Sequence, residues 1–316
     1  MRLHKKTESN VTLAIANQIA KSLLAVILLG SGAILESKGE RDAGSKPSNE
    51  PLIVLCFNIR IDNPKDGENA WPNRKDFVAA LIRFHKADLI GMQEARPVQI
   101  EDLEAALPDY SWYGVGQNDG NMPGSGSHNV IFYRKDRFKL LKQGAFWCSE
   151  TPDTPSLGWD ATNKRTVSWV KLEDAQNGRA FYHFNTHFSH VSEQARKGSA
   201  QLLRQRMDQI VTPTTLPVIV TGDLNATPEA IAYETMTSSD FGRIQLFDAG
   251  EQSETGRYGP GGTFNRFDIA RVPEQPIDYI FVTDHIRVKR FGVLSDSSEG
   301  RLPSDHYPVL AEILFR

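Results

Sequence analysis

Polar side chains suited to catalysis stand at the ends of apolar runs in this 316-residue chain. They are Asn58, Glu94, His187, Asp223 with Asn225, and Asp305 with His306, and we expect each at or just beyond the C-terminal end of a strand. Taken singly, each could form a turn, a cap or a satisfied buried hydrogen bond. Because so many separate structural explanations would have to coincide, the pattern indicates one site built from carboxylates, amides and imidazoles.

Short apolar runs rich in β-branched and aromatic residues predict the strands that carry these side chains. We expect strands at residues 52–58, 87–94, 129–135, 166–172, 179–188, 217–225, 278–283 and 308–315. Helical periodicity predicts helices at residues 74–86, 98–107 and 193–210. Stretches rich in Gly, Pro, Asn and Asp predict long surface loops at residues 114–127, 149–163 and 250–276.

Several of these runs are apolar on both faces of the predicted strand, and helices lie between some of them. This pattern favours an α/β (α+β) fold in which two packed sheets are covered on the outside by helices. Strand ends in such a sheet open toward one rim, so side chains far apart in the sequence can converge there.

Six short motifs carry a family resemblance in their order and spacing. They are NIR at 58–60, MQE at 92–94, NTH at 185–187, GDLNATP at 222–228, IDYIFV at 277–282 and SDHYPV at 304–309. Through them, residues 52–315 resemble the endonuclease/exonuclease/phosphatase (DNase I-like) superfamily, and FWCSETP, GWD and GTFNRF resemble an often exported bacterial branch of it. The resemblance implies a four-layer αββα sandwich, with two packed mixed β-sheets flanked by helices.

The resemblance also implies roles for the carboxylates and amides. Glu94, with Asn58 and Asp305, would hold a hard cation, Mg²⁺ or Mn²⁺, because such ions prefer oxygen ligands. Asp223 and Asn225 would orient and deprotonate the attacking water, or position the scissile phosphate.

For the basic side chains, similarity suggests contacts with the phosphate and with the leaving group. His306 would hydrogen-bond the phosphate, and Asp278 would fix its tautomer and raise its basicity. His187 would stabilise or protonate the departing oxygen. Arg165 is a candidate phosphate contact, with a surface salt bridge as the alternative.

One position departs from the family pattern. Relatives often place a Glu before the strand at 129–135, where it supports the equivalent of His187, but this chain has Ser127 and His128 there. We therefore expect His187 to contribute less to the rate than His306.

Composition and cysteine content set limits on partners and on the metal. A formal net charge of −3 and a pI of about 6.3 argue against a strong overall field for nucleic acid, although a local basic groove could exist. Cys56 and Cys148 match no zinc spacing, so a metal would need oxygen and imidazole ligands. The apolar run around Cys56 favours a buried, inert thiol, and a disulfide between Cys56 and Cys148 is the alternative.

The N-terminal part differs in composition from the rest of the chain. Residues 1–35 contain basic residues followed by an uncharged apolar run at 22–35, which is typical of a signal peptide and shorter than a membrane span. Residues 36–50 favour a flexible linker, and residues 51–316 the catalytic domain. We therefore expect export to the periplasm or the extracellular space. One alternative is that an uncleaved leader tethers the protein to the membrane, and another is that the start codon is misassigned.

The function that these features favour is divalent-metal-dependent hydrolysis of a phosphoester, of the phosphodiesterase, nuclease or phosphatase type. A small substrate is slightly favoured over nucleic acid, because the predicted loops show no basic and aromatic stripe. Two alternatives are a non-catalytic metal- or phosphate-binding module on the same fold and a sphingomyelinase-like lipid phosphodiesterase. The oligomeric state is not predicted.

Overall fold

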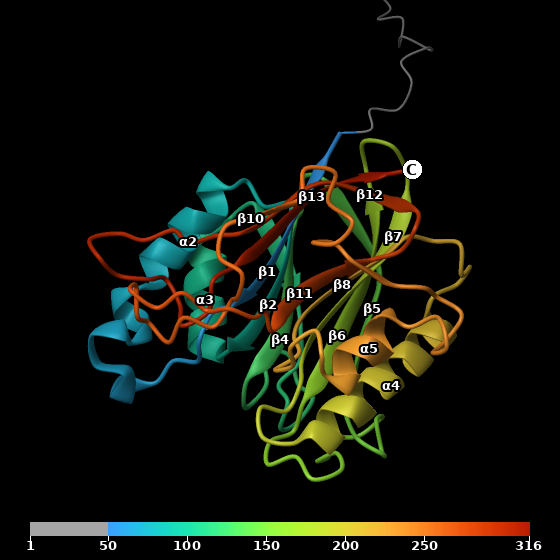
Figure 1. Cartoon of the computed structure of the whole chain (residues 1–316), viewed down its shortest axis with the longest axis horizontal. Coiled ribbons are helices and arrows are strands. Elements are labelled where there is room, and N and C mark those ends of the chain that lie inside the picture. Colours follow the sequence, from blue (N-terminus) through green and yellow to red (C-terminus); the bar gives the residue numbers. More distant parts are fainter. Residues whose placement is uncertain (1–49) are drawn as a thin grey trace, which may run out of the picture. The chain divides into compact units, whose positions relative to one another are not determined.

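Two β-sheets packed face to face form the centre of the computed structural model, which describes residues 50–316 (Figure 1). The first sheet consists of β1 (Leu52–Asn58), β2 (Leu89–Ala95), β3 (Tyr110–Tyr113), β4 (His128–Arg134), β10 (Arg257–Tyr258), β12 (Ile286–Val293) and β13 (Val309–Phe315). Its strand order is β10-β12-β13-β1-β2-β4-β3. The β1–β2 pair is parallel and β1–β13 is antiparallel, so the sheet is mixed.

The second sheet is also mixed. It consists of β5 (Phe138–Trp147), β6 (Thr166–Asp174), β7 (Ala180–His187), β8 (Val218–Asp223), β9 (Phe247–Asp248) and β11 (Asp278–Val282), in the order β5-β6-β7-β8-β11-β9. The β7–β8 pair is parallel, and β11 runs antiparallel to β8. Side chains of both sheets, such as Val54 and Phe181, share one buried apolar cluster.

Helices cover the outer face of each sheet (Figure 1). On the first sheet lie α2 (Lys75–Phe84) and α3 (Pro97–Ala106), preceded by the 3₁₀ helices η1 (Pro64–Asn69) and η2 (Trp71–Asn73). On the second lie α4 (Glu193–Ile210) and α5 (Ile231–Thr237). The four layers are therefore helix, sheet, sheet and helix, which confirms the predicted αββα sandwich.

The predicted elements that border the site occur close to their predicted bounds, and α4 has the predicted bounds at both ends. The prediction omitted β3, β5, β9, β10, β12, α5 and both 3₁₀ helices. The middle of β5 reads KLLKQ and is exposed, since this strand lies at the edge of its sheet. It therefore lacks the buried apolar run by which the predicted strands were identified. The strand β10 interrupts the loop predicted at 250–276.

A buried polar network joins the two sheets just beneath the predicted site. Gln93 on β2 donates to Asn185 Oδ1 on β7 at 2.7 Å, and Asn185 donates to the carbonyls of Met92 and Val130. The sheets approach closely here, since a Cβ at Gly91 would lie 1.9 Å from Thr221 Oγ1. Only glycine fits at that position without moving the second sheet.

Both cysteines are buried free thiols, so the bridge that was left open does not form. Cys56 packs between the sheets, and Cys148 packs in the cluster under α4. The predicted leader at 1–35, and the predicted linker at 36–50 except its last residue, lie outside the described residues. Among the described residues, no helix is long and apolar enough to cross a membrane. Export and the domain boundaries stay predictions.

Candidate active site

One edge of the sandwich gathers the polar side chains that the sequence singled out. The strands β1, β7 and β8 end at this edge with Asn58, His187 and Asp223, and Glu94 is the last residue but one of β2. Asp278 is the first residue of β11 and lies directly opposite Asp223, because β11 and β8 are antiparallel. Asp305 and His306 precede β13 instead of following a strand, so that part of the prediction was wrong. They reach the same edge because β13 runs antiparallel to β1.

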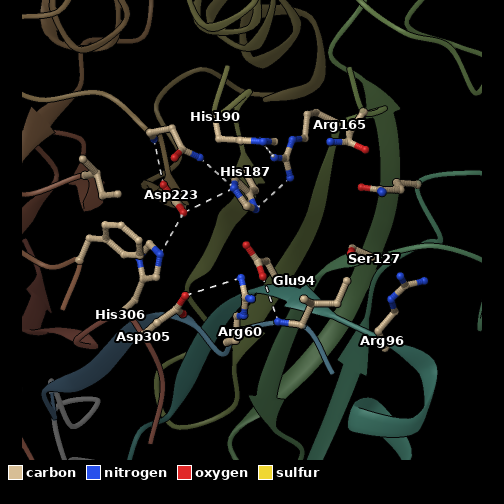
Figure 2. A pocket seen from close by; sticks show the side chains of 16 residues that line it. Arg60, Glu94, Arg96, Ser127, Arg165, His187, His190, Asp223, Asp305 and His306 are labelled. Carbon is tan, nitrogen blue, oxygen red and sulfur yellow. Dashed lines mark hydrogen bonds and ion pairs between the residues drawn. The ribbon is translucent and has the colours of Figure 1, made fainter. Parts of the chain in front are cut away.

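Most of these residues line a pocket of about 370 Å³ (Figure 2). The predicted site residues in its lining are Glu94, Arg165, His187, Asp223, Asn225, Asp305 and His306. Asn58 and Asp278 are not part of the lining and reach it through hydrogen bonds with Asp223 and His306. The lining residues that were not predicted are Arg60, Ile61, Arg96, Gln117, Ser127, Asn163, His190, Phe264 and Ile277. The volume is in the range of pockets that bind small molecules.

His306 lies between two carboxylates. Its Nδ1 is 2.8 Å from Asp278 Oδ2, and its Nε2 is 3.9 Å from Asp223 Oδ2. Burial works against a charge on this ring, but Asp278, then Asp223 and Asp305, raise the pKa of His306 well above its usual value. These carboxylates therefore favour the protonated form of His306, the form that donates to a phosphate.

Asp223 is the buried carboxylate at the centre of the pocket. Its Oδ1 accepts the Asn225 backbone N–H at 2.9 Å, and its Oδ2 accepts from Asn58 Nδ2 at 3.0 Å. Burial, and after it the charge of Asp278, raise the pKa of Asp223 to about 7. A carboxylate with that pKa can accept a proton from water near neutral pH. Asn225 has a positive φ of 48°, which is a strained backbone conformation of the kind found at functional sites.

Glu94 and Asp305 form the side of the pocket that suits a cation. Glu94, at a positive φ of 68°, accepts the Ile61 N–H at 2.9 Å and Asn58 Nδ2 at 3.3 Å. Burial, and the neighbouring Glu94 charge, raise the pKa of Asp305 against the opposite effects of His306 and Arg60. Asn58 uses its Oδ1 to accept the Arg60 N–H, so direct ligation by Asn58 stays a prediction.

His187 is held in an environment opposite to that of His306. Its Nδ1 is 3.1 Å from Arg165 Nη1, and its Nε2 is 2.9 Å from Asn225 Nδ2 and 3.4 Å from Asp223 Oδ2. Burial, then the charges of Arg165 and His306, lower the pKa of His187 well below its usual value. The ring is therefore neutral, which suits a hydrogen bond to a departing oxygen better than its protonation.

Arg165 is the residue that supports His187 in this protein. It is buried at 9% exposure, and its second terminal nitrogen lies 3.2 Å from His190 Nδ1. It forms no ion pair with any residue from 50 to 316, so the surface salt bridge offered as an alternative was wrong. Arg165 thus lies at the edge of the His187 ring where relatives were expected to place a Glu.

The two residues at the departure from the family pattern have different surroundings. Ser127 lines the pocket. His128 is buried, with Nδ1 at 3.2 Å from the Ala95 carbonyl oxygen and Nε2 accepting the Gly124 N–H at 3.1 Å. His128 therefore connects the loop before β4 to the end of β2 and does not support His187.

Some of the residues that the sequence analysis missed had a recognisable sequence context. Arg60 follows Asn58 by two positions within NIR, and Phe264 lies in the GTF motif. Phe264 packs on His306 with ring centroids 4.9 Å apart. Arg96 and His190 carry no comparable pattern, because their approach to the pocket depends on the packing of the strand ends.

A family model confirms the resemblance. The model of the Endonuclease/Exonuclease/phosphatase family matches residues 55–306. The chain belongs to this family. Its members are phosphoester hydrolases, and enzymes with this fold typically use divalent metal ions.

Solved structures and curated proteins agree with this assignment. A mannosyl-6-phosphatase of Bacteroides thetaiotaomicron is 38% identical, with 84% of this chain and 100% of that chain covered and a TM-score of 0.78. A family protein of Bacteroides vulgatus is 39% identical, with 84% and 99% covered and a TM-score of 0.77. Mouse Nocturnin is 28% identical over 289 residues, which cover 83% of this chain and 64% of Nocturnin. The chain spans about two thirds of the length of the curated relatives it matches.

The donor set fits a hard divalent cation. Ligand atoms of Asp223, Asp278 and His306 lie within 4.8 Å of one another, but Asp278 and His306 are already bonded to each other. Glu94 and Asp305 line the same pocket, and the charge of Glu94 acts on Asp305. These two carboxylates could hold a divalent cation, because Mg²⁺ and Mn²⁺ prefer oxygen ligands.

Proposed function

We propose that this protein is a phosphoester hydrolase that requires Mg²⁺ or Mn²⁺ and acts on a small phosphorylated molecule. The observation that supports the proposal is the pocket itself. It combines a carboxylate with a pKa near neutrality, a histidine whose protonated form is favoured by nearby carboxylates, and the acidic residues Glu94 and Asp305 around about 370 Å³. Phosphoester hydrolysis needs a base for water, a donor for the phosphate and neutralisation of its charge.

Each of these requirements has a residue that meets it. Asp223 accepts a proton from the attacking water, while Asn225 and Asn58 fix the orientation of its carboxylate. His306, held by Asp278, donates to a phosphate oxygen. When bound at Glu94 and Asp305, a divalent cation supplies positive charge that stabilises the phosphate in the transition state.

The leaving group has its own donor. His187 accepts from Arg165 at Nδ1, so its neutral ring carries the proton on Nε2, which faces Asp223 and can donate to the departing oxygen. Arg165, on the other edge of the ring, keeps the imidazole uncharged and fixes its orientation. A neutral donor is sufficient when the leaving oxygen can take its proton from solvent.

The substrate class follows from the relative and from the pocket. The relative at 38% identity is named a mannosyl-6-phosphatase, which supports a sugar phosphate or another small phosphoester for this chain. The small volume of the pocket agrees with such a substrate. We also propose action outside the cytoplasm, supported by the apolar run at 22–35.

The test is a substrate panel with matched variants. We expect the EDTA-treated protein to be inactive on mannose 6-phosphate, p-nitrophenyl phosphate and bis-p-nitrophenyl phosphate, and Mg²⁺ or Mn²⁺ to restore phosphate or nitrophenol release. Asp223→Asn should lower kcat by about 10³-fold at unchanged thermal stability, since a general base contributes about 10²–10⁴-fold.

Metal binding provides a readout that is independent of turnover. Calorimetric titration with Mn²⁺ should show a site in the wild type that Glu94→Ala loses. Inactivity with every metal on these substrates and on single-stranded DNA would exclude hydrolysis. Equal Mn²⁺ binding by the wild type and by Glu94→Ala would exclude the cation site.

A further inference from the structure

Two arginines of the pocket lie apart from most of its carboxylates. Figure 2 shows Asp305 and Asp223 with Arg60 and His306 on one side, Arg165 and Arg96 on the other, and Glu94 between them. The side with Arg165 and Arg96, here called the basic side, also contains His190, 3.2 Å from an Arg165 nitrogen, and the polar residue Ser127. The mechanism proposed above uses the carboxylates and leaves most of the basic side without a role.

Arg165 is the more buried of the two arginines on this side. Its exposure is 9%, it contacts two histidine rings, and its Nε is buried without a hydrogen-bond partner among the described residues. Removing a guanidinium from water without an ion-paired carboxylate is costly, and burial lowers the pKa of Arg165 against the smaller opposite effects of Glu94 and Asp223. A bound anion would offset that cost.

Arg96 provides a second positive charge on the same side. It stands at the N-cap of α3, two residues after Glu94, and is partly buried against the pocket. Within residues 50–316, its side chain forms no ion pair and donates no hydrogen bond. Arg60, the third arginine of the pocket, is in contrast paired with Asp66 and lies 3.7 Å from Asp305.

The ring of His187 separates this basic side from the reacting centre. Its Nε2 edge faces Asp223, and its Nδ1 edge faces Arg165. A phosphate that accepts from His306 beside Asp223 therefore lies on one side of the imidazole, and Arg165 lies on the other. An anion bound by Arg165 is thus a different group from the one that is hydrolysed.

We propose that Arg96 and Arg165, with His190, bind a second anionic group of the substrate. The preferred substrate is then a small molecule that carries, besides the phosphate to be hydrolysed, another phosphate or a carboxylate. This inference rests on the proposed function and adds the substrate's charge pattern to it. The pocket of about 370 Å³ has room for a sugar-sized molecule with both groups.

Three sugar phosphates that differ in the second group test this inference with the Mg²⁺- or Mn²⁺-saturated full chain. They are glucose 6-phosphate, glucose 1,6-bisphosphate and 6-phosphogluconate. We expect kcat/KM to be about 10-fold or more higher for one or both of the doubly charged compounds, since charge-assisted hydrogen bonds contribute that much. If only glucose 1,6-bisphosphate is preferred, the subsite binds a second phosphate. If only 6-phosphogluconate is preferred, the subsite binds a carboxylate.

Variants of Arg96 then test whether this residue causes the preference for doubly charged substrates. Arg96→Gln should lower the ratio of kcat/KM between the doubly and singly charged substrates by about 10-fold. Arg96→Lys should restore part of the ratio. Arg83→Gln, on the exposed surface of α2, is the matched control and should leave the ratio unchanged. Thermal melting of each variant checks that the fold is intact.

The outcomes distinguish this inference from the proposed function. If no phosphoester is hydrolysed, the proposed function fails. If glucose 6-phosphate is hydrolysed as efficiently as both doubly charged compounds, only the second-anion subsite is overturned. An unchanged ratio in a folded Arg96→Gln variant also overturns it.

Discussion

The two histidines of the pocket show how neighbouring charges give one residue type different properties. His306 has carboxylates near both ring nitrogens, which favour its protonated form. His187 is buried, with the charges of Arg165 and His306 beside it, and these surroundings favour its neutral form. A charged residue on the phosphate and a neutral one at the leaving group follow from these surroundings.

At the residue scale, we expect His306→Ala to reduce kcat more than His187→Ala. Loss of the charged donor should cost about 10³-fold, while loss of a neutral hydrogen bond should cost about 10-fold. Steady-state kinetics on the best substrate of the panel measures both. If alanine at His187 proved the more damaging change, the assignment of a minor role to His187 would be wrong.

The loop from Thr263 onward holds the segments that carry Asp278 and His306 together. Thr263 is fully buried, and its Oγ1 accepts the N–H groups of Ile277 at 3.1 Å and Asp278 at 3.3 Å. Its carbonyl accepts the Tyr307 N–H at 2.7 Å. Thr263 is therefore a positioning residue for the Asp278–His306 pair, which gives the GTF motif a physical role.

Thr263→Val tests this at the scale of the loop. Valine keeps the shape but leaves two buried N–H groups without their acceptor, at a cost of about 1–3 kcal/mol. We expect kcat to fall by about 10- to 100-fold, because small displacements of catalytic groups are costly, and KM to change little. Thr263→Ser should retain most of the activity. A folded Thr263→Val variant with wild-type kcat would contradict the positioning role.

The close contact between the sheets makes a separate prediction. Gly91→Ala would place a methyl group 1.9 Å from Thr221 Oγ1 and 2.7 Å from Asn185 Oδ1, so the sheets would have to move apart. We expect a loss of about 1–3 kcal/mol in the free energy of unfolding. Gly292→Ala on β12 is the control, since its nearest atom would be 3.4 Å away, an ordinary contact. Similar denaturation midpoints for the two variants would show that the close approach of the sheets at Gly91 does not determine stability.

For the whole molecule, a buried neutral histidine predicts loss of stability in acid. His183 lies in the inter-sheet network, 2.8 Å from Thr221 Oγ1, and burial lowers its pKa to about 3. The unfolded chain has a His pKa of about 6.5, so between these values the unfolded state binds more protons than the folded state. Stability should therefore fall as the pH drops below about 6.5, by up to about 1.4 kcal/mol per pH unit, and should be unaffected by this group above it.

Denaturant unfolding at several pH values from 7 to 4 measures this effect. We expect His183→Gln to lose less stability over that range than the wild type. His285→Gln is the control, because that side chain is 43% exposed. If the free energy of unfolding changed equally with pH in all three proteins, His183 would not be the group that causes the loss of stability in acid.

The sequence alone determined the residue types of the site and the strands that carry them. Apolar runs that lead to Asn58, Glu94, His187 and Asp223 predicted both, because each strand is buried at all but one of its residues or throughout. The same rule failed for the exposed centre of β5, which carries no site residue. It also placed Asp305 and His306 after a strand, since a sequence does not show the direction in which a strand enters the sheet.

Only the tertiary structure decided which side chains face one another. The Asn58–Asp223 hydrogen bond joins residues 165 positions apart, and the pairing of Arg165 with His187 joins two strands whose register no sequence pattern reveals. The unpaired Arg96 reaches the pocket only because α3 starts where β2 ends. Charge states and substrate contacts depend on distances of a few ångströms, and sheet packing sets those distances.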